Sequence, residues 1–491
     1  MNTTQLSEAK RSLLEKYLHG NTATISVTSA SMMRRSGADS APLSPTQEGI
    51  WQNAQRRGVP PFYNESITIH RHGQIDLAVL ERCMVEILRR HEAWRTTFEV
   101  QDGRPVQVVH RAPDSFPIPL VDVRHLPETE RENAALALAT SDVLRPFDLE
   151  QGPLVRPTLV RLGEEEYRFY LAVHQIIIDG VTAYHIFLPE LVALYEAFSQ
   201  GKPSPLPELT LQCADVADWQ CHWLKGEVFD TQLAYWRKHL SGELPVLKWP
   251  NDGPRPAKQT FRGTFHPFRL PQELSEQLNE FSQNEGVTLF VVLLTCYYAL
   301  LHHYTGQNDI IVGTVSPSGR KRAEAQPLLG YFLNPVPLRV DLSNDPTVRE
   351  LLRRVRRTTV GALSCDDLPF EKMVDILRPS TDPGRNPFFD VAASLEPAMP
   401  EVDPSWSLTP MDIASGGGRW DMYLVWDYRP DGIIGRVQYN PDVLRTETVT
   451  TMLKHQEILL RQIVSDPNQQ LSDLISNVEG PAQGSGGKNY E

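Results

Sequence analysis

The chain has 491 residues, which is enough for two or three domains that each bury their own core. Hydrophobic residues make up 41% of the chain and charged residues 22%, the balance of a globular protein in water. The net charge of -13 is spread along the chain without a basic face, which argues against a nucleic-acid-binding protein.

The N-terminal segment Met1–Asn21 lacks the apolar core and cleavage site of a secretory signal. Within it, Ser7–Leu18 has the spacing of a short amphipathic helix that ends at Gly20. Residues 21–40 follow with little periodicity. We interpret residues 1–40 as a helix and linker, either a plain connection or a junction to an upstream domain.

Strands and helices then alternate through an expected first subdomain, residues 41–207. Ala78–Arg90 carries apolar residues at helical spacing. Thr96–Val100 and Val106–Val109, separated by a turn at Asp102–Gly103, predict a β-hairpin. Tyr167–Val173 is β-prone and predicts a strand.

A helix is expected over Val181–Gln200, and the Pro-rich segment Lys202–Pro207 then divides the chain. Residues 208–478 repeat the same alternation and form the expected second subdomain, followed by a flexible tail at 479–491. Its expected elements are helices at Leu274–Glu285, Leu289–Tyr304 and Thr446–Ser465, and strands at Asp309–Thr314 and Gly432–Tyr439. Both halves therefore predict an α/β (α+β) fold.

The five cysteines are odd in number, widely spaced and without a C-x-x-C pair. This pattern is typical of free thiols in a reducing compartment. No apolar run reaches the roughly 18 residues that span a bilayer. We expect a cytoplasmic protein that does not enter a membrane.

One turn combines residue types that suit chemistry. His174 ends the predicted strand, and Asp179-Gly180 immediately precedes the predicted helix. Glycine lets a substrate approach the backbone, and a helix N-terminus offers free N–H groups. A histidine near an Asp-Gly pair also occurs by chance, so this turn alone favours a structural histidine.

Seven segments in order are similar to the motifs of the condensation domains of nonribosomal peptide synthetases. His174–Gly180 matches H-H-x-x-x-D-G except at its second position, and Thr46 and Gly49 depart from the opening motif. The segments are Leu43–Trp51, Arg90–Phe98, His174–Gly180, Ala214–Trp219, Leu329–Pro335, Asp367–Glu371 and Arg385–Phe388.

This resemblance implies two chloramphenicol-acetyltransferase-like subdomains arranged as a V-shaped pseudo-dimer, with a tunnel and the active site between them. It implies amide formation: a donor acyl thioester on one carrier protein is transferred to the amine of an aminoacyl group on another. The partners are then donor and acceptor carrier proteins and neighbouring synthetase modules. The resemblance implies no metal and no bound cofactor, because phosphopantetheine arms deliver the substrates.

The resemblance also assigns roles to residues of the turn. His174, Asp179 and Gly180 correspond to motif positions that shape the loop beside the reacting atoms. Asp179 is expected to pair with an arginine of the second half. Arg320 is the candidate, and Arg322 is the alternative because the local spacing is one residue longer than the family pattern.

Position 175, where the family has its functional histidine, is glutamine in this chain. Gln175 has no titratable group, so it cannot act as a general base, but its amide can donate or accept a hydrogen bond. Three interpretations stay open: an active subgroup that uses Gln175 for positioning, a silent domain that serves as scaffold or gate, or an introduced substitution. We favour the first, because glutamine here resembles a variant of condensation domains that follow polyketide modules.

Four further residues are secondary candidates. Tyr184, Ser316 and Asn334 are expected to line the tunnel, and Arg95 in the second motif is expected to be structural. Trp420–Tyr423, after a glycine triplet, resembles the region where the second subdomain crosses to the first.

Rival functions are a silent domain that binds carrier proteins and an ester-forming relative. Epimerization is disfavoured, because that branch relies on the missing histidine.

Overall fold

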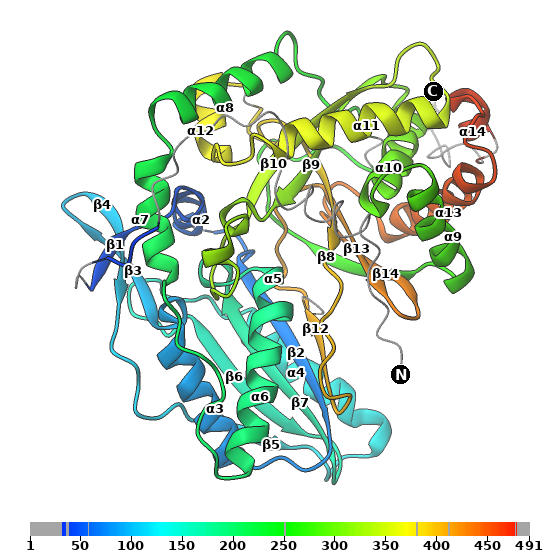
Figure 1. The fold of residues 1–491 in the computed structure, drawn as a ribbon. Coiled ribbons are helices and arrows are strands. Elements are labelled where there is room, and N and C mark those ends of the chain that lie inside the picture. The colour runs from blue at the N-terminus through cyan, green and yellow to red at the C-terminus, as the bar shows by residue number, and fades with distance from the viewer. Residues whose placement is uncertain are drawn as a thin grey trace, which may run out of the picture.

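The computed structural model describes residues 32–35, 39–56, 58–249, 252–379, 382–410, 413–476 and 478. The helix expected at Ser7–Leu18 and the tail expected at 479–491 lie outside these residues. The described chain forms two bodies of mixed strands and helices that lie side by side (Figure 1). This arrangement confirms the mixed α/β fold expected from the sequence.

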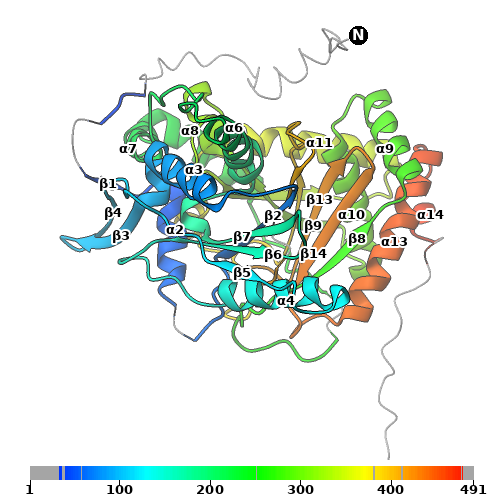
Figure 2. The ribbon, with the colours of Figure 1, turned by 90° about the horizontal axis from the view of Figure 1, so that it is seen from below.

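The elements of the first body are β2 (Asn64–His72), β5 (Leu120–Asp122), β6 (Val155–Arg161), β7 (Glu166–His174), β12 (Trp406–Pro410), α3 (Leu77–Arg90), α4 (Glu128–Val143) and α6 (Leu188–Ser199). The strands form one sheet in the order β12-β2-β7-β6-β5. Helices α3 and α6 cover one face of this sheet, and α4 covers the other (Figure 2). The three layers bury β7 at the centre of the body.

Strand β7 is buried on both faces. Phe169, Leu171 and Val173 point into the core shared with α3 and α6, whereas Tyr170 and Ala172 pack in the smaller core beneath α4. This explains why the segment is continuously apolar, since alternate side chains enter two different cores. The strand ends at His174, at the end of the sheet that faces the second body.

A small separate sheet confirms the expected hairpin. Its strands are β1 (Ser40–Pro42), β3 (Thr96–Gln101) and β4 (Arg104–Val109), in the order β1-β4-β3. Asp102 and Gly103 both have positive φ, of 51° and 75°, as the predicted Asp-Gly turn requires.

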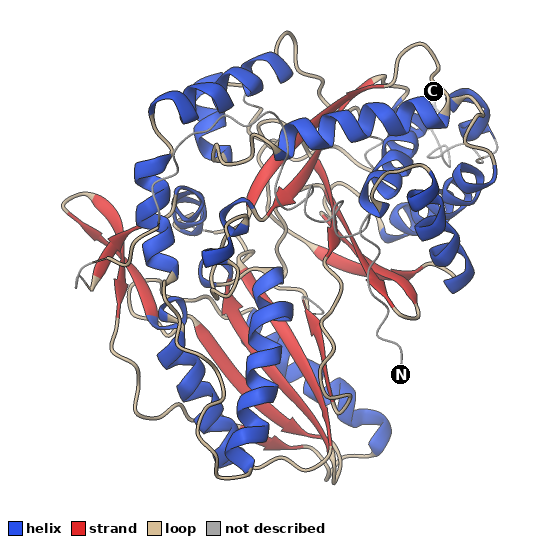
Figure 3. Ribbon diagram, viewed as in Figure 1, coloured by secondary structure: helices blue, strands red, loops and turns tan. Residues whose placement is uncertain are grey.

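The elements of the second body are β8 (Thr264–Arg269), β9 (Asp309–Ser316), β10 (Asn334–Asp341), β11 (Val391–Glu396), β13 (Met422–Arg429), β14 (Gly432–Tyr439), α9 (Gln272–Asn284), α10 (Leu289–Thr305), α11 (Val348–Leu363), α13 (Thr446–Ser465) and α14 (Leu471–Ser476). The strands form a six-stranded sheet in the order β10-β9-β11-β13-β14-β8. In Figure 3 the helices of this body, drawn in blue, lie beside its strands, drawn in red. The inner strand β11 is parallel to both of its neighbours, β9 and β13. Its last residue, Glu396, therefore lies at the same end of the sheet as the C-terminal ends of β9 and β13.

The chain crosses from the second body to the first at β12, which pairs with β2 in antiparallel register from Trp406↔Arg71 to Pro410↔Ile67. The sequence placed this crossing later, at Trp420–Tyr423, and that prediction is wrong. Met422 and Tyr423 begin β13 in the sheet of the second body. The misplacement arises because a single short strand that joins a distant sheet leaves little local signal.

The helix expected after the motif turn is present but irregular. Gly180–Thr182 (α5) begins it, Ala183–Phe187 forms a π-helical turn, and α6 completes it. π-helical turns are rare and occur often at functional sites. The remaining helices are α2 (Pro45–Ala54), α7 (Cys213–Trp223), α8 (Gly226–His239) and α12 (Phe370–Leu377).

The second core is packed tightly enough that one glycine in a central strand is required. Gly313 on β9 is buried, and a Cβ atom there would lie 1.9 Å from Cε2 of Phe389. We expect Gly313→Ala to lower the free energy of unfolding by about 1–3 kcal/mol through overpacking, as urea denaturation would measure. Phe389→Leu in the same background should recover part of the loss. Equal stability of Gly313→Ala and the parent would show that the Phe389 ring can move aside without cost.

Candidate active site

The motif turn begins where β7 ends and where the two bodies meet. His174 is the last residue of β7, Gln175–Ile177 forms a short 3₁₀ turn, and Asp179 is the N-cap of α5. The side-chain amide of Gln47 on α2 donates to the Ile176 carbonyl at 3.0 Å. The opening motif and the central motif of the sequence are therefore in direct contact.

Asp179 ties the motif turn to the second body. Its carboxylate is fully buried and accepts hydrogen bonds from the N–H groups of Thr182 at 2.8 Å and Phe332 at 3.0 Å. Nη2 of Arg320 lies 3.4 Å from Oδ1 of the same carboxylate. A carboxylate with all these donors is held in place, which suits a structural role and not that of a base.

Of the two arginines considered for this pair, Arg320 is the one that reaches Asp179. Its guanidinium also donates to the Leu328 carbonyl at 2.7 Å and lies 4.3 Å from the centre of the Phe332 ring. Arg322 instead lies over Trp219, at 4.2 Å from the ring centre. The guanidinium of Arg320 thus links the turn to the loop before β10.

His174 is neutral in this structure. Its ring is buried, and its Nδ1 accepts a hydrogen bond from the Ile176 N–H at 3.3 Å, so the proton resides on Nε2. Burial lowers the pKa of His174 to about 3. The aromatic rings of Tyr63 and Phe147 lie 6.0 and 6.1 Å from its centre. The imidazole therefore shapes the turn.

Gln175 is anchored through its backbone and not through its side chain. Its N–H donates to the Tyr63 carbonyl at 2.8 Å, and its carbonyl accepts from the Ile178 N–H at 3.2 Å. The side chain is half-buried and has no hydrogen-bond partner among the residues that the structure describes. Its amide is available to a ligand.

A buried group of charged side chains faces Gly180, and we did not expect it from the sequence. A methyl group on Gly180 would lie 3.1 Å from Oε2 of Glu396, the last residue of β11. Oε1 of Glu396 lies 3.7 Å from Nη2 of Arg436 on β14, and each of these side chains is only 15% exposed. The one available signal was a glutamate that ends a strand in which Ser394 is the one other polar residue, Val391–Glu396.

Glu65 on β2 belongs to the same group. Burial, together with the nearby charge of Glu396, raises the pKa of Glu65 to about 8, and Arg436 opposes that shift. Burial also raises the pKa of Glu396 above its usual range. Carboxylates from both bodies therefore share Arg436 beside the motif glycine.

Tyr184 lies against this group. It belongs to the π-helical turn, is 1% exposed, and its hydroxyl has no hydrogen-bond partner among the described residues. Burial and the charge of Glu396 raise its pKa well above the usual value. The neutral phenol is thus a free hydrogen-bond donor or acceptor.

Ser316 and Asn334 lie opposite each other in the β9–β10 ladder. The hydroxyl of Ser316 donates to the Asp366 carboxylate, and the amide of Asn334 bonds to the backbone of the loop between α11 and α12. Arg95 donates from Nε to the Leu88 carbonyl at 3.0 Å and from Nη1 to the His110 carbonyl. The polar atoms of these residues are occupied by the fold.

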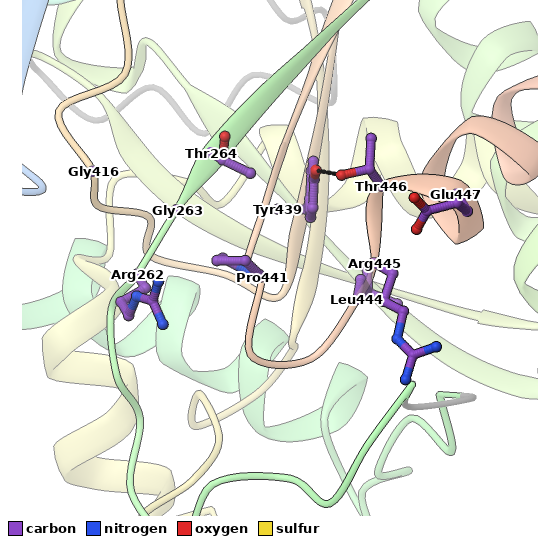
Figure 4. A pocket seen from close by; sticks show the side chains of 10 residues that line it. All are labelled: Arg262, Gly263, Thr264, Gly416, Tyr439, Pro441, Leu444, Arg445, Thr446 and Glu447. Atoms are coloured by element: carbon purple, nitrogen blue, oxygen red, sulfur yellow. Dashed lines mark hydrogen bonds between the residues drawn. The ribbon is translucent and has the colours of Figure 1, made fainter. Parts of the chain in front are cut away.

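A separate pocket of about 680 Å³ lies away from the motif turn, between β8, β14, the loop at Gly416 and the start of α13 (Figure 4). Tyr439 and Thr446 share a hydrogen bond of 2.8 Å across its wall, and Arg262 and Arg445 lie at its rim. No residue of His174–Gly180 lines this pocket. Its shape therefore does not bear on the chemistry of the turn.

The described residues contain no group of three or more His, Cys, Asp or Glu side chains that could hold a metal ion. Within the same part of the chain, no single helix is both long and apolar enough to cross a bilayer, although the bent pair α9 and α10 together meets that criterion. All five cysteines are free.

Comparisons with known proteins place these features in a family. The model of the condensation domain matches residues 37–480. One of the linear gramicidin synthase proteins of Brevibacillus parabrevis is 40% identical over 452 residues, which cover 91% of this chain and 9% of the longer protein. Phosphinothricin tripeptide synthetase PhsC of Streptomyces viridochromogenes is 34% identical over 96% of this chain and 43% of its own length. The chain thus spans less than half of these curated relatives.

Solved structures with the same fold cover nearly the whole chain. The X-domain from teicoplanin biosynthesis superposes with a TM-score of 0.78 and 26% identity, covering 90% of this chain and 99% of that one. The first condensation domain of the calcium-dependent antibiotic synthetase has a TM-score of 0.76 at 20% identity, covering 89% of this chain and 99% of that one. The family model, which matches residues 37–480, shows that the chain belongs to the condensation-domain family, whose members are acyltransferases that form amide bonds in nonribosomal peptide synthesis.

Proposed function

We propose that this chain transfers a carrier-bound acyl thioester, peptidyl or polyketide, to the amine of a carrier-bound aminoacyl acceptor, forming an amide. The observation that carries the proposal is the side-chain amide of Gln175, which has no hydrogen-bond partner among the described residues. This amide lies on a turn that the ion pair of Asp179 and Arg320 holds between the two bodies. Its partners are donor and acceptor carrier proteins within a synthetase, and phosphopantetheine arms deliver both substrates.

Gln175 acts through hydrogen bonding in this proposal. Its Nε2 donates to the oxyanion that forms when the amine attacks the thioester carbonyl, or its Oε1 accepts from the attacking amine. Holding both substrates at one turn supplies most of the remaining acceleration through proximity. His174 and Asp179 keep the turn in shape, and Gly180 leaves room at the helix N-terminus.

The proposed division of the chain places the first subdomain at 41–207 and the second at 208–478. Two separate sheets support it. Some segments after residue 207 nevertheless pack in the core of the first body, among them Leu211, Cys213 and the loop Leu328–Phe332. Tyr184, with its free hydroxyl, is the best supported of the tunnel-lining candidates.

A single-turnover assay with loaded donor and acceptor carriers tests the function. The parent chain should transfer well above background, and Gln175→Ala should be slower by about 10²–10³-fold, the usual cost of losing one oxyanion donor. Gln175→His should be equal to or faster than the parent. Separate melting curves would establish that each variant is folded.

Three outcomes would contradict the proposal in different ways. Transfer by Gln175→His but not by the parent would show that Gln175 does not support the reaction by positioning the substrates. No transfer by either form, with both still binding carrier proteins, would favour a silent domain that acts as scaffold or gate. Transfer to a hydroxyl acceptor in preference to an amine would favour an ester-forming relative.

A further inference from the structure

We propose that Glu396 accepts the proton that the acceptor amine releases on attacking the thioester, the task for which Gln175 has no titratable group. The inference rests on the proposed function and deepens it. Its starting point is the contact between the Glu396 carboxylate and the motif glycine, where a methyl group would lie 3.1 Å from Oε2. The carboxylate thus lies directly against the motif turn at Gly180.

The position of Glu396 follows from the sheet. β11 lies between β9 and β13 and is parallel to both, and Glu396 ends it opposite Asp427 on β13. Its side chain is 15% exposed, so it is largely desolvated but still accessible. A carboxylate in such a place is a stronger base than one in water and can reach a ligand.

The charges around Glu396 leave one carboxylate without a dedicated counterion. Glu396 and Glu65 both face Arg436, whereas Asp427 pairs with Arg429 and Asp179 with Arg320. Since burial and the charge of Glu396 raise the pKa of Glu65 to about 8, Glu65 holds its proton at neutral pH. Burial raises the pKa of Glu396 as well, whereas Arg436, whose Nη2 lies 3.7 Å from Oε1 of Glu396, opposes that shift and favours the charged form of Glu396.

The proton transfer balances without any co-reactant. The amine nitrogen bonds to the carbonyl carbon, and an N–H proton moves to a carboxylate oxygen of Glu396. The tetrahedral intermediate then collapses, the C–S bond breaks, and the departing thiolate recovers that proton as a thiol. The carboxylate is regenerated, and the donor carrier leaves with a free phosphopantetheine thiol.

The test is Glu396→Gln in single turnover with loaded carriers across a range of pH. This change keeps the shape and an acceptor for Arg436, but it removes the base, so transfer should fall by about 10²–10⁴-fold. In the parent, the rate should rise as Glu396 ionises, and that limb of the profile should be absent from the variant. The limb that belongs to the amine itself should remain in both.

A second variant separates a base from a structural role. Adding Gln175→His to Glu396→Gln supplies another base on the facing turn, so at least tenfold of the lost rate should return, a small part of the usual general-base effect of about 10²–10⁴. Glu65→Gln removes a group that is already neutral, so its loss should be much smaller than that of Glu396→Gln.

Several results would overturn the inference. A Glu396→Gln rate and pH profile equal to those of the parent would remove Glu396 from proton transfer, as would a larger loss at Glu65 than at Glu396. A loss that Gln175→His fails to rescue would make Glu396 structural. A parent chain that transfers nothing would instead defeat the proposed function itself.

Discussion

Replacing Asp179 with alanine is expected to lower the free energy of unfolding by about 3–5 kcal/mol, the usual effect of breaking a buried ion pair from one side. The side chain of Arg320 is 5% exposed and would lose the carboxylate that balances its charge. The N–H groups of Thr182 and Phe332 would lose their acceptor at the same time. Urea denaturation followed by tryptophan fluorescence would measure the change.

Two matched variants identify the cause of this loss. Asp179→Asn keeps an acceptor for the Thr182 N–H but removes the charge, so it should be destabilised less than Asp179→Ala. The double variant Asp179→Ala/Arg320→Met removes the stranded charge and should be more stable than Asp179→Ala alone. A loss of chain transfer by Asp179→Ala without any loss of stability would contradict this account and would place Asp179 at the substrate.

Long segments with a single strong pattern were predictable from sequence. The expected ranges Gly432–Tyr439 and Thr446–Ser465 are those of β14 and α13. Both segments pack their apolar faces on one core, so their periodicity reflects their surroundings directly. The choice of Arg320 as the partner of Asp179 followed from the family resemblance, and the ion pair is present.

Features that depend on distant segments were not predictable. Glu396 and Arg436 are 40 residues apart by number, and their meeting with Gly180 depends on how two sheets face each other. A lone glutamate at the end of a strand has the same local appearance whether it faces solvent or a buried arginine. β12 was missed for a similar reason, since its partner β2 lies more than 300 residues earlier in the chain.

Asn334 is the residue for which sequence and structure suggest different roles. From the sequence it was expected to line the tunnel, but its side chain is fully buried and fully bonded. Its Nδ2 donates to the carbonyls of Asp366 at 2.7 Å and Leu368 at 2.9 Å, and its Oδ1 accepts from the Phe370 N–H at 3.0 Å. These bonds hold the loop that joins α11 to α12, and Asp366 in that loop also contacts Ser316.

Asn334→Ala is therefore expected to lower the free energy of unfolding by about 2–4 kcal/mol, because each buried polar group left unpaired costs about 1–3 kcal/mol. Asn334→Asp should be no better, since its carboxylate would face the carbonyls of Asp366 and Leu368. Urea denaturation gives the stability, and single-turnover transfer at low temperature gives the activity of the folded fraction. A structural role predicts near-parental transfer once the fraction folded is taken into account. Slowed transfer by a fully stable Asn334→Ala would instead place this amide at the substrate. A side chain that only holds the loop would affect the rate through stability alone.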